Sequence, residues 1–101
     1  DWQGAKKLRN KFPKTSIIDF FILPPNKKEL RERLVKRGRD NKKEINKRLS
    51  LAVSEINHYK EYKYVLVNDN VKKTADFIKK IIEYENILDL IKSKVESINI
   101  L

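Results

Sequence analysis

Only two short segments of this 101-residue chain have the apolar character of buried β-strands, and helical sequence surrounds both. Residues 15–23 contain a nearly continuous apolar run, and residues 64–67 form a second. Such runs, alternating with helices, favour a parallel α/β sheet with both faces covered. Asp19 interrupts the first run, and we expect it at a bulge or facing solvent. Because two strands alone leave their edges open, we expect part of a larger sheet, whose exposed edges favour self-association.

The other segments carry the periodicity and the start signals of helices. A first helix is predicted from Asp1 to Lys11, before Pro13. Asn26 and Asn41 each stand three residues before a glutamate, which is typical of a capped helix start. Residues 68–70 predict a turn that caps a last helix, and residues 87–98 either continue that helix or form another.

The net charge of +10 lies in the first half of the chain, which also holds all six arginines. A basic half attracts nucleic acid, nucleotides or acidic surfaces. No interleaving of aromatic and basic residues supports nucleic-acid binding, so a small basic nucleic-acid binder is the weaker reading. No apolar run is long enough to cross a membrane. Without cysteine, and with His58 alone, the sequence predicts no metal site of its own and favours a cytoplasmic protein.

Four stretches in order carry recognisable motifs. They are Asp1-Trp2-Gln3-Gly4; Phe21-Ile22-Leu23-Pro24-Pro25; Arg37-Gly38 with Asp40, Ile45 and Arg48-Leu49; and His58-Tyr59 with Glu61-Tyr62, Tyr64 and Val67-Asn68-Asp69. Together they resemble the guanylate kinase family over residues 1–84. The resemblance implies a P-loop nucleoside-monophosphate kinase fold with a lid at about residues 37–49, and it leaves residues 85–101 as a helical tail. It also implies transfer of a phosphoryl group from ATP to GMP, giving ADP and GDP, with Mg²⁺.

The family's phosphate-binding loop, G-x-x-x-x-G-K-[ST], does not occur in the chain, whose only glycines are Gly4 and Gly38. The family's GMP-binding region has no counterpart either. We therefore expect the C-terminal part of a guanylate kinase, inactive alone and without tight binding of ATP or Mg²⁺. The alternative is a guanylate-kinase-like interaction module without enzymatic activity, although the retained lid arginines argue against it.

Arg37 and Arg48 are the candidate catalytic residues. Phosphoryl transfer needs cancellation of charge on the moving group, and a guanidinium stays charged and forms paired bonds to phosphate oxygens. By resemblance both arginines belong to the lid that closes over the ATP phosphates. The alternative reading is that they are solvated surface charges. Arg31 and Arg33 are expected on the helix surface, although either could approach phosphate.

Three further residues are candidates for nucleotide binding. Asp1 matches the family's acidic residue near GMP and magnesium, where a carboxylate orders the cation's water shell. An ordinary helix cap is the alternative for Asp1. Asn68 and Asp69 follow the second predicted strand, at the edge where α/β sheets bind ligands, and by resemblance they lie near adenine. Both are also common turn residues.

Overall fold

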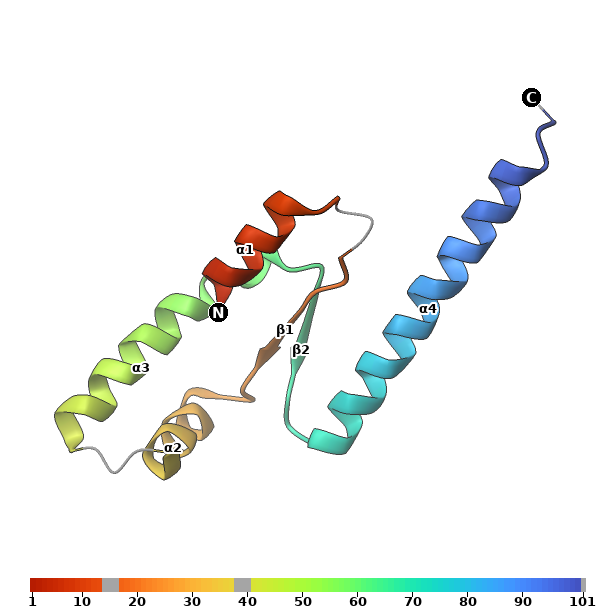
Figure 1. Cartoon of the computed structure of the whole chain (residues 1–101). Coiled ribbons are helices and arrows are strands. Elements are labelled where there is room, and N and C mark those ends of the chain that lie inside the picture. Colours follow the sequence, from red (N-terminus) through yellow and green to blue (C-terminus); the bar gives the residue numbers. More distant parts are fainter. Residues whose placement is uncertain (14–16, 38–40, 101) are drawn as a thin grey trace. The chain divides into compact units, whose positions relative to one another are not determined.

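The computed structural model describes residues 1–13, 17–37 and 41–100 of the chain. Figure 1 shows its elements, which in chain order are α1 (Trp2–Lys11), β1 (Phe20–Leu23), α2 (Lys27–Arg37), α3 (Lys42–Ile56), the 3-10 helix η2 (Tyr59–Glu61), β2 (Tyr64–Val67) and α4 (Val71–Ser97). The chain forms two compact units, Asp1–Asp69 and Asn70–Leu101. Every element except α4 belongs to the first unit.

The two strands pair in parallel, which confirms the predicted α/β class. Phe20 stands opposite Tyr64, and Leu23 stands opposite Val67. The Phe20 and Tyr64 rings stack across the strands with centroids 5.4 Å apart, as cross-strand aromatic neighbours do. At the carboxyl ends the amide of Asn68 donates to the Leu23 carbonyl over 2.7 Å. The pairing therefore places the end of each strand at one common edge.

The predicted burial of both strands was wrong for this chain. Exposure alternates along β2, where Val65 and Val67 are 38% and 52% exposed, and Ile22 in β1 is 40% exposed. Among the described residues, no apolar side chain is fully buried. The physical reason is geometric, because a sheet of two strands packs one face and leaves the rest open. Residues 14–16, where the first strand was expected to begin, lie outside the described residues.

Asp19 neither bulges nor faces solvent, contrary to the sequence-based expectation. Its side chain is only 17% exposed and lies 2.8 Å from Nε of Arg9 in α1. The direction of that N–H departs from hydrogen-bond geometry, so the contact is an ion pair. The other carboxylate oxygen accepts the backbone N–H of Lys63 over 2.7 Å. Asp19 therefore joins α1, the start of β1 and the segment before β2.

Replacing Asp19 by Ala is expected to lower the free energy of unfolding by about 2–3 kcal/mol, since it leaves a largely buried guanidinium without its counter-charge. Urea denaturation of the full chain, followed by circular dichroism, measures this. Asp76→Ala is the matched control, because the Asp76–Lys80 pair is exposed and such pairs contribute about 0–1 kcal/mol. Equal effects of the two substitutions would contradict the role of Asp19.

The helix starts follow the local signals in the sequence. The side chains of Asn26 and Asn41 accept the amides of Glu29 and Glu44 over 2.8 and 3.0 Å. Asn70 accepts the amide of Lys73 over 3.0 Å and starts α4. These bonds satisfy amides that a helix start leaves unpaired. Residues 87–98 continue the last helix, because α4 runs unbroken to Ser97.

Two packed helices follow β1 in the first unit. Leu30 and Leu34 of α2 and Ile45 and Leu49 of α3 are half-buried, as their helical spacing predicts. At its other end α3 approaches the first turn of α1 (Figure 1). In the second unit, α4 stands as a single 27-residue helix. A search of the described helices found none with the length and apolar character needed to cross a membrane.

Candidate phosphate-binding pocket

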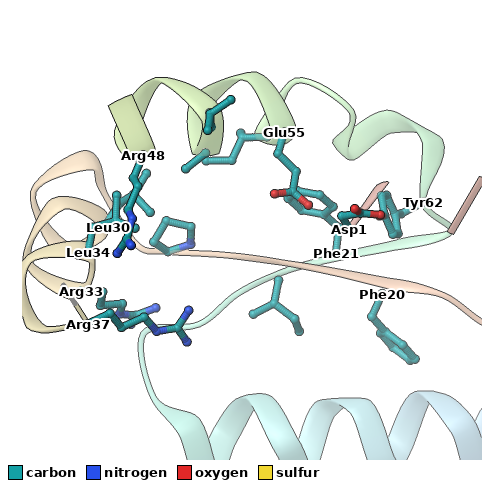
Figure 2. Close-up of a pocket in the computed structure, with 15 residues that line it drawn as sticks. Asp1, Phe20, Phe21, Leu30, Arg33, Leu34, Arg37, Arg48, Glu55 and Tyr62 are labelled. Carbon is teal, nitrogen blue, oxygen red and sulfur yellow. The ribbon is translucent and has the colours of Figure 1, made fainter. Parts of the chain in front are cut away.

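The first unit contains an open pocket of about 610 Å³ beside the sheet. Apolar residues of β1, α2 and α3 form much of its lining, among them Phe20, Phe21, Ile22, Leu30, Leu34 and Leu51. Figure 2 shows that its charged side chains fall into two groups, with arginines toward one end and carboxylates toward the other. The pocket thus has a basic end and an acidic end.

Three arginines line the basic end: Arg33, Arg37 and Arg48. Two come from α2, four residues apart, which places them on the same face of that helix. Arg48 comes from α3, whose start is fixed by the Asn41 cap. The structure therefore brings both candidate catalytic arginines to one pocket. Residues 38–40, inside the predicted lid, lie outside the described residues.

Arg33 is a pocket residue that the sequence reasoning missed. The sequence-based expectation was a side chain on the helix surface, with an approach to phosphate left open, and Arg33 is indeed exposed. Its Nη2 donates to the backbone carbonyl of Asn68 over 3.3 Å and lies 4.0 Å from the Glu29 carboxylate. The i, i+4 spacing from Arg33 to Arg37 was the signal that could have found it. This bond also ties α2 to the end of β2.

Two carboxylates, Asp1 and Glu55, lie at the acidic end with the rings of Phe21 and Tyr62 (Figure 2). Glu55 stands seven residues after Arg48, two helical turns along the same face of α3. Asp1 is also the N-cap of α1, since its Oδ1 accepts the amide of Gly4 over 2.7 Å. The cap and the pocket position are therefore compatible.

Tyr62 sits between this pocket and the Arg9–Asp19 pair. Its ring meets Phe21 edge to face with centroids 4.8 Å apart, and the Arg9 guanidinium lies 4.8 Å from the ring centroid. Burial raises the pKa of the Tyr62 hydroxyl above its usual value, and the positive charge of Arg9 opposes that shift. Tyr62 therefore stays neutral and forms an apolar wall of the pocket.

Asn68 and Asp69 do not line the pocket, although both were candidate site residues. They follow β2, at the common carboxyl edge of the two strands. Asn68 is half-buried, and its carbonyl accepts a hydrogen bond from Arg33 at the basic end. Asp69 is exposed. The structure thus gathers Asp1, Arg37 and Arg48 and leaves these two residues beside them.

Comparison with known proteins shows the family of this chain. The family model described as guanylate kinase matches residues 1–85. The chain belongs to the guanylate kinase family. It is 47% identical to the guanylate kinase of Haemophilus influenzae (strain 86-028NP) over 87 residues, which are 86% of this chain and 41% of that relative.

A second relative matches along the whole chain. The guanylate kinase of Buchnera aphidicola subsp. Baizongia pistaciae is 45% identical over 101 residues, covering 100% of this chain and 47% of the relative. The chain therefore spans less than half the length of these guanylate kinases. The family model ends at residue 85, whereas α4 continues to Ser97.

Proposed function

We propose that these residues are the C-terminal part of a guanylate kinase that transfers a phosphoryl group from ATP to GMP. The proposal is supported by one observation: in a member of this family, three arginines and two carboxylates line opposite ends of the same pocket. In the complete protein the two-stranded parallel sheet would extend into the larger sheet of a P-loop kinase fold. The chain itself would supply the lid, with Arg37 and Arg48, and the loop after β2.

Arg37 and Arg48 would bind oxygens of the transferring phosphate. Arg33 would also contact this phosphate, because it lines the same end of the pocket. Charge spreads over the phosphoryl oxygens in the transition state, so side chains that keep a positive charge lower the barrier. Each guanidinium offers planar paired donors. Because the two helices contribute separate arginines, a phosphate between α2 and α3 would hold both helices together and exclude water.

Asp1 fits a site beside a magnesium–nucleotide complex. Mg²⁺ bound to nucleotide phosphates keeps several waters and takes one or two protein carboxylates. Oδ1 of Asp1 accepts the Gly4 amide, whereas no described residue is hydrogen-bonded to its second oxygen. The bound cation would offset negative charge on the phosphates. The Asp1 carboxylate would accept a hydrogen bond from a water bound to the cation or from a donor group of GMP.

Asn68 and Asp69 would border the adenine of ATP. Their support is their position at the carboxyl edge of the parallel strands, where α/β folds bind ligands. The bond from Arg33 to the Asn68 carbonyl would keep this loop next to the phosphate-binding helices. Residues 1–84 would then form the C-terminal part of the kinase domain, and residues 85–101 a helical tail.

A graft tests the proposed function. The segment of the Haemophilus influenzae guanylate kinase that aligns with this chain is replaced by the 87 aligned residues of this chain. We expect the grafted enzyme to form ADP and GDP from ATP and GMP, with kcat within about tenfold of the parent, because Arg33, Arg37 and Arg48 are supplied by the graft. A coupled assay measures this. A folded graft without turnover, as judged by circular dichroism, would overturn the proposal.

A further inference from the structure

The first turn of α1 is joined to the end of α3 by two stacked rings. The indole of Trp2 and the imidazole of His58 lie nearly parallel, at 8°, with centroids 3.6 Å apart. Nδ1 of His58 also contacts the Glu61 carboxylate. Trp2 is the first residue of α1, and His58 follows directly after the C-cap of α3. Residues 56 positions apart in the sequence therefore join the first turn of α1 to the segment after α3.

The position of the Asp1 carboxylate depends on that first turn. Asp1 immediately precedes Trp2, and its Oδ1 accepts the Gly4 amide one turn along. A Cβ at Gly4 would lie 3.3 Å from the same oxygen, so a side chain there requires the carboxylate to shift by a few tenths of an ångström. Helix ends fray, and the Trp2–His58 stack holds the residue next to Asp1.

We propose that His58 is a positioning residue: through Trp2 it holds Asp1 at the acidic end of the pocket. The inference rests on the proposed function, since it gives Asp1 a task beside the nucleotides. His58 lies two residues after the last residue of α3, the helix that carries Arg48 and Glu55. Through Trp2 and His58, Asp1 is thus connected to α3, the helix that supplies Arg48 at the basic end of the pocket. Misplacement of a reacting group by about 1 Å costs on the order of 100-fold in rate.

The positional step can be tested on the full chain, where Trp2 is the only tryptophan. In His58→Ala we expect more efficient acrylamide quenching of Trp2 fluorescence. The Gly4 amide should exchange with solvent about tenfold faster in NMR measurements, because the cap that protects it opens more often. His58→Phe keeps a flat ring and should restore both readouts. Lys60→Ala, at an exposed lysine in the next turn, is the matched control and should leave both unchanged.

The functional step is tested in the grafted enzyme. His58→Ala should lower kcat about 10- to 100-fold, with KM for ATP within about twofold. His58→Phe should recover most of the loss, and Lys60→Ala should have no effect. Gly4→Ala separates position from stability, because alanine favours the helix yet crowds Asp1. We expect Gly4→Ala to raise the melting temperature of the grafted enzyme, or leave it unchanged, while lowering kcat.

The outcomes distinguish this inference from the proposed function. If the graft without further substitutions is inactive, the proposed function is overturned. Quenching of Trp2 fluorescence and exchange of the Gly4 amide in the full chain then still test whether His58 positions Asp1 through Trp2. Unchanged Gly4 exchange in His58→Ala overturns the inference. So does an active graft in which His58→Ala keeps its kcat, or in which Lys60→Ala loses as much activity. Loss of activity that His58→Phe fails to recover also overturns it.

Discussion

Arg48→Ala in the grafted guanylate kinase is expected to lower kcat by about 10³-fold, with a much smaller change in GMP binding. An arginine that stabilises the charge of a transferring phosphoryl group contributes rate enhancements of about 10³–10⁵. Arg48 is the only pocket arginine that α3 supplies, because Arg33 and Arg37 both belong to α2. Single-turnover kinetics and GMP titration measure the two effects separately.

Two further variants make this result specific. Arg48→Lys keeps the positive charge but loses the planar pair of donors, so we expect it to recover little of the lost rate. Arg31→Ala is the matched control, since Arg31 is an exposed arginine that does not line the pocket. A kcat of Arg48→Ala equal to that of Arg31→Ala would place Arg48 among the solvated surface charges.

The helix starts and the bounds of the second strand were predictable because their causes are local. Asn26, Asn41 and Asn70 cap their helices through amides three residues along the chain, and this spacing is visible in the sequence. The second strand was predicted with correct bounds from a four-residue apolar run. The extent of β1 was not predictable in the same way. The Asp19 carboxylate accepts a hydrogen bond from the backbone amide of Lys63, 44 residues away, and no local sequence pattern predicts that bond.

The pocket was predictable only in part, for a similar reason. Motif resemblance selected Arg37 and Arg48, and both line it. Arg33 was expected on the helix surface, with an approach to phosphate left open, although its spacing to Arg37 already placed the two on one face. The Trp2–His58 stack had no sequence signal at all, since each residue alone is unremarkable and their contact depends on the packing of α1 against the end of α3.

The 101 residues alone are expected to show no turnover of ATP and GMP in the presence of Mg²⁺. The chain contains no G-x-x-x-x-G-K-[ST] loop, whose backbone amides would cradle the phosphates. Arg33, Arg37 and Arg48 can attract an anion, but the pocket that they line is open to water, which weakens each contact. Without the cradle, ATP would be neither held in line with an acceptor nor shielded from solvent. A coupled assay should therefore return the background rate.

A matched variant makes this negative result decisive. Trace guanylate kinase from the expression host would give a rate that is the same in preparations of the chain and of its Arg48→Ala variant. Turnover that belongs to the chain would instead fall on removal of Arg48, because this guanidinium would be among the few groups able to offset charge on the transferring phosphate. Activity that survives purification and drops in Arg48→Ala would show that side-chain charge alone supports the reaction. The need for the glycine-rich loop would then be refuted, while the role of Arg48 would stand.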